Sequence, residues 1–314
     1  MTADQFLNNS DDIRTSLIFS GSRLAHPVCA YIYLANNQEV NIEMLKLSRE
    51  ILKDDNGVFS PFRSHLELVF ACMLAVDQDP GTKMLVVNAA YDALKDYFSP
   101  SSYLSLLAFF MSDRVKPENF YEVASRARQM HDGMNQQHRF LTDAEDITYA
   151  GLLALHREDI YQTLAELEEM YQFLEPVFGI FEKDSVQALT HGLALCAGEP
   201  MQKCDNFLEI YQILRQEKIN WRASYDLVSL AILANVGIDI PTVAQDILDV
   251  YDYLEGTSQY GIFGFSKQYR IAHATMIVSA YYMAGNAELL CAVTISALKA
   301  IIAAQSASAS AASV

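Results

Sequence analysis

The segment "GVFSPFRSHLELVFACMLA" at residues 57–75 has a counterpart, "GIFGFSKQYRIAHATMIVSA", at residues 261–280. In both, a phenylalanine follows a glycine by two residues, and a short polar turn leads into an apolar run rich in small residues. Aromatic residues equivalent to the phenylalanine of this segment recur about every 40 residues, a period typical of helical-repeat proteins. These markers are Phe59, Phe98, Phe140, Phe181, Trp221 and Phe263.

A second set of aromatic residues keeps the same period inside the intervening segments. Tyr91, Tyr171, Tyr211 and Tyr251 are separated by 80, 40 and 40 residues. The stretch around each tyrosine has apolar residues at three- and four-residue spacing with acids between them, as in "LAELEEMYQFLEPVF", which predicts an amphipathic helix. We expect these tyrosines to pack between neighbouring helices.

Each repeat unit therefore predicts a helical hairpin with two different helices. The first is short and apolar on nearly every face, as in "LSLLAFFM", so it should lie inside; the second is amphipathic and should cover it. Prolines recur between the two, and proline suits the first turn of a helix because its missing N–H would be unpaired there anyway. We expect the second helices to begin near Pro80, Pro117, Pro200 and Pro241.

The predicted fold is all-α, with about seven hairpins of roughly 40 residues stacked as an α/α superhelix, either an open solenoid or a closed toroid. Residues 1–22 are predicted to be an N-terminal capping segment, 23–304 a single repeat domain and 305–314 a low-complexity tail. Residues 289–304 carry a single charged side chain, that of Lys299. That apolar helix should dock onto the rest of the chain or form a homo-oligomer.

The charge and the cysteine content narrow the classes of partner. A net charge of −17 argues against nucleic acid and against anionic membrane surfaces, and favours a basic protein or peptide. The N-terminus lacks the basic start and apolar run of a secretory signal, and no clean membrane span of about 20 apolar residues is present. Five cysteines in apolar runs indicate reduced thiols, and hence a cytoplasmic protein.

Common catalytic and cofactor motifs, including those for dinucleotides, nucleoside triphosphates and zinc, are absent, so we expect no cofactor and no metal. His191 and His273 each lie ten residues after their aromatic marker, so equivalent positions could line one channel. With His65 and Asp226 they form a candidate pocket at the N-termini of the inner helices. The alternative interpretation is that the two histidines are hydrogen-bonded core residues.

An acidic stretch, "DILDVYDYLE", is the candidate surface for a basic partner. Acids three residues apart lie near one another on a helix, and such a face can hold a basic peptide or a cation. The alternative is an ordinary solvated face. The acids concerned are Asp246, Asp249, Asp252 and Glu255.

The segments "FRSHLELVFACMLA", "RFLTDAEDITYAGLLALH" and "LALCAGEPMQKCDNFLEIYQIL" resemble the bacterial family catalogued as domain of unknown function (DUF) family 4003. The likeness runs over residues 20–304. It implies a cytoplasmic, all-helical protein of Gram-positive bacteria, with no established activity and no catalytic residues to carry over. A weaker, architectural likeness is to α/α toroids such as prenyltransferases and terpene cyclases, whose zinc ligands and Asp-rich motifs are missing here.

Two functions follow as hypotheses. The first is a non-catalytic helical-repeat module that binds a protein or peptide. The second is a toroid-like enzyme or small-molecule binder with its pocket at the inner-helix N-termini. The sequence leaves open whether the protein is an enzyme.

Overall fold

The computed structural model describes residues 2–16, 23–54, 57, 60–64, 66–139, 141–142, 144–178, 183–219, 227–261, 264–286 and 289–299. Within these ranges the chain forms helices joined by turns, and none of it is β-strand, which confirms the predicted all-α class. The chain divides into two compact units. The N-terminal unit is built mainly from Asp4–Ile160 and the C-terminal unit mainly from Tyr161–Ala300.

In the N-terminal unit, short apolar helices alternate with longer amphipathic ones. Each amphipathic helix packs against the apolar helix that follows it: α3 on α4, α5 on α6 and α7 on α8. Apolar helices also pack on one another, α2 on α4 and α6 on α8. The elements are α1 (Thr2–Thr15), α2 (Ala25–Ala35), α3 (Ile42–Asp54), η1 (Pro61–Arg63), α4 (Glu67–Ala75), α5 (Pro80–Lys95), α6 (Ser102–Arg114), η2 (Pro117–Asn119), α7 (Phe120–Gln137) and α8 (Asp146–His156).

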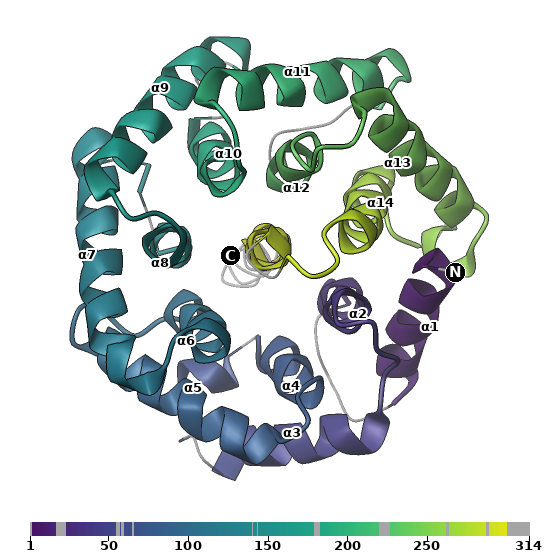
Figure 1. Ribbon diagram of the computed structural model, residues 1–314. Helices are drawn as coiled ribbons and strands as arrows, with labels where there is room; N and C mark the ends of the chain where they lie inside the picture. The colour runs from purple at the N-terminus through teal and green to yellow at the C-terminus, as the bar shows by residue number, and fades with distance from the viewer. Residues whose placement is uncertain are drawn as a thin grey trace, which may run out of the picture. The chain divides into compact units, whose positions relative to one another are not determined.

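The C-terminal unit repeats this arrangement. Figure 1 shows α10, α12 and α14 side by side, with α11 and α13 outside them, in agreement with the contacts between these helices. The elements are α9 (Ile160–Phe178), α10 (Lys183–Leu195), α11 (Pro200–Gln216), α12 (Leu227–Leu233), α13 (Ile240–Glu255), η4 (Ser258–Tyr260) and α14 (Lys267–Tyr282), followed by helical residues 289–299.

Burial separates the two kinds of helix as the sequence predicts. Every residue of α12 is buried, whereas α13 buries only Val243, Ala244, Ile247 and Leu254, at the spacing of one helix face. Removing a Leu, Ile or Val side chain from water stabilises the fold by about 1.5–3 kcal/mol. The apolar inner helices therefore form the core, and the amphipathic outer helices shield it.

The recurring prolines lie where the second helices begin. Pro80 and Pro200 are the first residues of α5 and α11, and Pro241 is the second residue of α13. Pro117 opens the short helix η2, which runs directly into α7. The predicted positions are confirmed, and they agree with the tolerance of a helix's first turn for a residue that lacks an N–H.

Aspartates cap two of these helices. The side chain of Asp79 accepts a hydrogen bond from the backbone N–H of Thr82 at 3.1 Å, and that of Asp239 accepts one from Thr242 at 3.2 Å. An N-cap of this kind is worth about 1 kcal/mol. In the sequences "DPGT" and "DIPT", the aspartate ends the preceding turn by capping the helix, and the helix begins at the next residue.

The helix at residues 289–299 docks within the C-terminal unit. All of its residues are buried except Leu290 and Lys299, which are partly exposed. Lys299 pairs with Asp184 of α10, with Nζ 2.8 Å from Oδ2. The apolar side chains of this helix are covered by the chain itself, as the docking alternative predicts, and the homo-oligomer stays a prediction.

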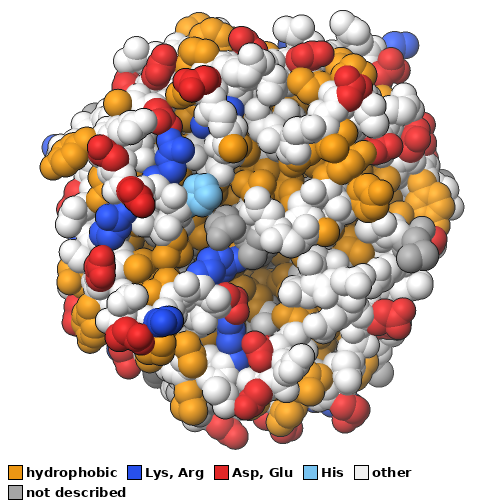
Figure 2. Space-filling view, viewed as in Figure 1, with side chains coloured by type: hydrophobic (Ala, Val, Ile, Leu, Met, Phe, Trp, Pro, Cys, Tyr) orange, Lys and Arg blue, Asp and Glu red, His pale blue; other side chains and the backbone are white. Residues whose placement is uncertain are grey.

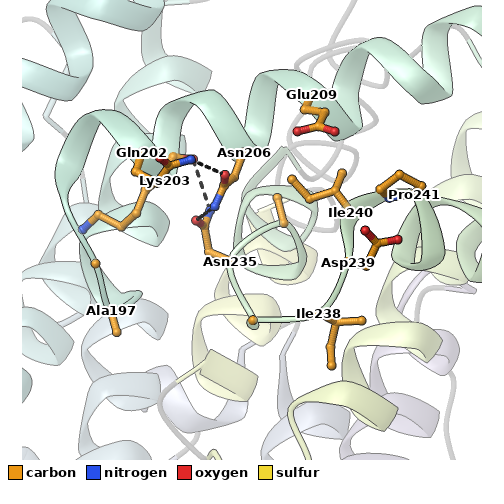
Figure 3. A pocket seen from close by; sticks show the side chains of 13 residues that line it. Ala197, Gln202, Lys203, Asn206, Glu209, Asn235, Ile238, Asp239, Ile240 and Pro241 are labelled. Atoms are coloured by element: carbon orange, nitrogen blue, oxygen red, sulfur yellow. Dashed lines mark hydrogen bonds between the residues drawn. The ribbon is translucent and has the colours of Figure 1, made fainter.

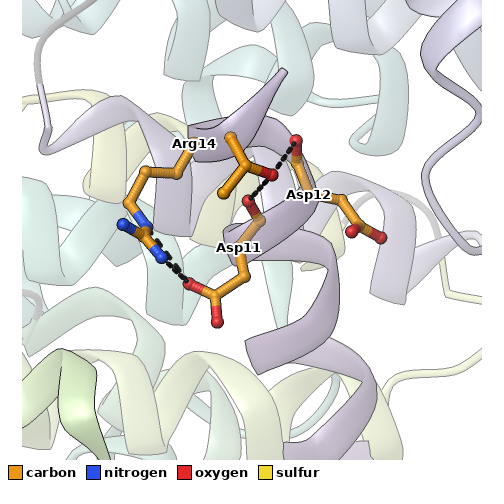
Figure 4. Close-up of polar contacts among 4 residues, drawn as sticks. Asp11, Asp12 and Arg14 are labelled. Atoms are coloured by element: carbon orange, nitrogen blue, oxygen red, sulfur yellow. Dashed lines mark hydrogen bonds and ion pairs between the residues drawn. The ribbon is translucent and has the colours of Figure 1, made fainter. Parts of the chain in front are cut away.

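Helix α1 lies in the segment predicted to cap the fold. Phe6 is fully buried on its inner face. On the outer face Arg14 pairs with Asp11 at 2.9 Å, and the Thr15 hydroxyl donates to the carbonyl oxygens of Asp11 and Asp12 (Figure 4). These contacts are local to one helix, so they stabilise α1 and offer no site for a ligand.

The surface is acidic without one dominant patch in view. Figure 2 shows Asp and Glu side chains scattered over one face, with Lys and Arg between them. No helix among the described residues is long and apolar enough to cross a membrane.

Candidate ligand-binding site

A pocket of about 410 Å³ lies in the C-terminal unit, between the turn that joins α10 to α11 and the turn that joins α12 to α13. Its volume is within the range of about 300–1,000 Å³ that is usual for ligand sites. The pocket opens to solvent and combines apolar and polar walls. Its lining residues are Ala197, Gly198, Gln202, Lys203, Asn206, Glu209, Ala234, Asn235, Gly237, Ile238, Asp239, Ile240 and Pro241.

Two glycines shape the turns that border the pocket. Gly198 has φ +108° and Gly237 has φ +79°, both in the region that side chains of L-residues disfavour. They let the chain leave an inner helix and enter the next outer helix within a few residues. The first turns of α11 and α13 are thereby brought beside the C-terminal ends of α10 and α12.

Three carboxamides form a hydrogen-bonded chain across the pocket wall (Figure 3). Gln202 Nε2 donates to Asn206 Oδ1 at 2.8 Å, and Asn206 Nδ2 donates to Asn235 Oδ1 at 3.1 Å. Asn235 Nδ2 donates to the backbone carbonyls of Ala231 at 2.8 Å and Lys203 at 3.2 Å. Because these two backbone carbonyls hold the Asn235 carboxamide in place, its oxygen orients Asn206, which in turn orients Gln202.

Two carboxylates lie at one end of the pocket, away from the amino group of Lys203 (Figure 3). Asp239 accepts from the N–H and the hydroxyl of Thr242, at 3.2 and 2.9 Å. Glu209 is exposed and makes no hydrogen bond or ion pair with any residue in the described ranges. This end of the pocket therefore presents negative charge with acceptor capacity to spare.

The opposite wall contains a buried cation beside two buried thiols. Lys203 is 1% exposed, and its Nζ donates to the carbonyl of Cys196 at 3.3 Å. Burial raises the pKa of Cys196 and of Cys204 to about 12, although Lys203 opposes both shifts. The two thiols are therefore protonated at neutral pH, which makes them poor nucleophiles.

The histidines predicted from the sequence lie elsewhere. His273 on α14 is buried, with its Nδ1 2.7 Å from the Tyr260 hydroxyl and its ring centroid 5.0 Å from that of Phe265. Burial lowers the pKa of His273 to about 3, so this imidazole is neutral. His191 on α10 is 2% exposed. Neither histidine lines the pocket.

Inner helix α12 lies between the two histidine-bearing helices, since it packs on both α10 and α14. Ala231 is the residue of α12 at the corresponding position. The remaining candidates, His65 and Asp226, lie outside the described residues. The pocket at the inner-helix N-termini thus stays a prediction, and the pocket described here lies at the C-terminal ends of those helices.

The first and last acids of the predicted basic-partner face have partners within the chain. Asp246 accepts a hydrogen bond from the Tyr282 hydroxyl near the end of α14. Glu255 pairs with Arg270 near the start of α14 at 2.9 Å, and this hydrogen bond lowers the pKa of Glu255. These two acids join antiparallel helices α13 and α14 at both ends.

The middle acids, Asp249 and Asp252, are exposed on α13. A step of three residues falls about 60° short of a full helical turn, so three such steps carry the side chain about halfway round the helix. Asp246 and Glu255 therefore lie on opposite sides of α13. Asp249 accepts a hydrogen bond from Gln245 on its own helix at 2.7 Å, so the acids of this stretch that face solvent without a partner on another helix are Asp249 and Asp252.

The pocket residues were not anticipated from the sequence. Gln202, Asn206 and Asn235 belong to no catalytic motif, and Glu209 resembles any acid of an outer helix. The available signal was positional, because Gln202 and Asn235 lie within a few residues of the Gly-containing turns that precede Pro200 and Pro241. In the described part of the chain, no group of three or more His, Cys, Asp or Glu side chains is placed to hold a metal ion.

Comparison of the chain with curated proteins and with solved structures finds no match. A family model matches residues 9–307, nearly the whole chain, in agreement with the resemblance noted from its sequence. The chain therefore belongs to the family described as "Protein of unknown function (DUF4003)".

Proposed function

We propose that this protein is a non-catalytic helical-repeat module that binds a protein or peptide, and that the pocket holds a stretch of extended main chain. The carboxamide chain of Gln202, Asn206 and Asn235 is the observation that carries this proposal. A primary amide offers donors and an acceptor in the same plane, which complements the N–H and C=O groups of a peptide.

Hydrogen-bonding capacity remains for such a ligand. Gln202 uses one N–H in its bond to Asn206, which leaves its second N–H and its carbonyl oxygen for a partner. Asn206 likewise retains one N–H after donating to Asn235. Apolar side chains of Ile238 and Ile240 line the same pocket and can cover the peptide's side chains. Main-chain bonds supplemented by small apolar contacts are a common mode of peptide recognition.

We also propose that the hairpins stack as an α/α superhelix. Hairpins of about 40 residues that contact their neighbours in sequence order are the building pattern of α/α superhelices, whether open solenoids or closed toroids. Contacts of α3 with α5, α5 with α7 and α11 with α13 support this stacking inside each unit. We also place the protein in the cytoplasm, because all five of its cysteines are buried, free thiols.

A peptide selection tests the binding function. A random octapeptide library is displayed against the immobilised full chain, and an enriched peptide is labelled and titrated by fluorescence anisotropy. Gln202→Ala should weaken its binding about fivefold, the value of one or two ordinary hydrogen bonds. The matched control is Gln162→Ala, an exposed glutamine 40 residues earlier in the first turn of α9.

Two results would overturn the proposal. One is a selection that enriches no peptide; the other is an enriched peptide that binds the two glutamine variants equally. Asp249→Lys separates the pocket from the acidic surface of α13. If this variant alone loses the peptide, the partner binds the exposed acids of α13 and the pocket assignment is wrong.

A further inference from the structure

An arginine of the chain shows how the end of an inner helix can hold a guanidinium group. Arg126 of α7 donates to three backbone carbonyls at the end of α8. Its guanidinium nitrogens lie 3.3 Å from the oxygen of Ala154, 2.7 Å from that of Arg157 and 3.2 Å from that of Glu158. The last carbonyls of a helix carry partial negative charge and lack partners within the helix, so they attract a cation.

The pocket occupies the corresponding place 80 residues further along. Asn206 of α11 corresponds to Arg126, and Ala234, Gly237 and Ile238 correspond to its three acceptors. All four of these residues line the pocket. The correspondence extends to the helix starts, because α9 begins at Ile160 and α13 begins at Ile240.

Asparagine is much shorter than arginine, and the amide N–H of Asn206 donates to the side chain of Asn235 instead of to the turn's carbonyls. The carbonyls of Ala234, Gly237 and Ile238 accept no hydrogen bond from the described residues. The two turns also differ in length, because α12 ends at Leu233 whereas α8 continues to His156. The space that a guanidinium fills beside α8 is therefore available to a ligand beside α12.

The charges around this space favour a cation with several donors. Glu209 and Asp239 stand at the same end of the pocket, and Glu209 has no partner among the described residues. Lys203, the only cation among the described residues of the lining, points to the far wall and donates to Cys196 (Figure 3). A planar guanidinium with five N–H donors can bond a carboxylate and carbonyl oxygens together, which a compact ammonium does less well.

We propose that the pocket recognises the guanidinium group of an arginine side chain on the bound peptide. This inference rests on the proposed function for the peptide itself. The guanidinium could also come from a free compound such as agmatine, and the two sources are distinguished by experiment.

Binding to the full-length protein is measured with fluorescein-labelled Gly-Ala-Arg-Ala-Gly and with the same peptide carrying citrulline, the neutral isostere of arginine. Agmatine is titrated separately by calorimetry. We expect the citrulline peptide to bind at least about tenfold more weakly, because it loses charge-assisted hydrogen bonds. Asp239→Asn should also weaken the arginine peptide while keeping the helix cap, and Asp159→Asn, 80 residues earlier, is the matched control.

Asn206→Arg gives the most direct test. It places on α11 the residue that α7 already has, so the protein's own guanidinium should fill the pocket and abolish binding. If circular dichroism shows that this variant does not fold, the double variant Glu209→Gln/Asp239→Asn replaces it. Unchanged binding of the arginine peptide by whichever variant is used would overturn the inference.

The outcomes separate the inference from the function on which it rests. Equal binding of the arginine and citrulline peptides overturns guanidinium recognition and leaves peptide binding intact. Binding of agmatine without either peptide supports the guanidinium site and overturns the peptide as its source. Failure of all three probes, together with failure of the library selection, overturns both.

Discussion

Lys83 and Lys203 are 120 residues apart and are both buried on outer helices, yet their ammonium groups face different partners. Each follows the proline that opens its helix by three residues. Lys83 pairs with Asp113 on the next inner helix, α6, whereas Lys203 donates to Cys196 at the end of the preceding one, α10. The lysine three residues after the proline thus joins two helices by an ion pair in one hairpin and forms the wall of a pocket in another.

The ion pair between Lys83 and Asp113 should contribute modestly to the free energy of unfolding. Asp113→Asn should lower the free energy of unfolding by about 1 kcal/mol, because Lys83 is buried but the Asp113 side chain is 51% exposed and screened by water. Urea denaturation measures the difference, which should shrink in about 1 M salt. The control Asp92→Asn removes an exposed acid paired with Lys95 and should change little. An Asp113→Asn protein as stable as the wild type would contradict the prediction.

His273 should make the fold sensitive to acid. Its pKa is about 3 in the folded state because of burial, and about 6.5 when unfolded. Between these values the unfolded chain binds the extra proton, so stability falls as the pH decreases below about 6.5, by up to about 1.4 kcal/mol per pH unit. His273→Gln keeps a hydrogen-bond partner for Tyr260 and removes this titration.

The test compares how steeply the free energy of unfolding changes with pH in the wild type and in His273→Gln. Chemical denaturation of wild type and His273→Gln from pH 7 to pH 5 should give a flatter dependence for the variant, whatever its stability at pH 7. Other groups titrate equally in both proteins and cancel. Parallel slopes would mean that His273 takes up a proton in the folded state.

The hairpin pattern was accessible from sequence because it depends on local chemistry. The start of α5 follows from Asp79 and Pro80 alone, and the burial of α12 follows from its uniformly apolar residues. The pocket was not accessible in this way. It depends on how Asn206 and Asn235, from different hairpins, meet in space, and on the absence of an arginine that another hairpin has.

All five cysteines should be unreactive in the native protein. All five are buried, which keeps the reagent from reaching them. At Cys196 and Cys204 burial also raises the pKa to about 12, so these two thiols are almost fully protonated at pH 8. An Ellman assay should find few reactive thiols without denaturant and all five in 6 M guanidinium chloride. Rapid labelling of a native thiol would show that its helix opens readily to solvent.

Close approach of inner helices should depend on glycine. A Cβ atom at position 192 of α10 would lie 2.6 Å from Cγ1 of Val228 on α12, well inside van der Waals contact. Gly192→Ala should therefore destabilise the C-terminal unit by about 1–3 kcal/mol through overpacking.

A double-mutant cycle identifies the cause of that loss. Val228→Ala alone removes buried methyl groups and should also destabilise the fold, but the pair Gly192→Ala/Val228→Ala should recover much of the first loss, since the added methyl then has room. Denaturant titrations of the four proteins give the coupling energy. Strictly additive effects would mean that the cost at position 192 arises elsewhere than at Val228.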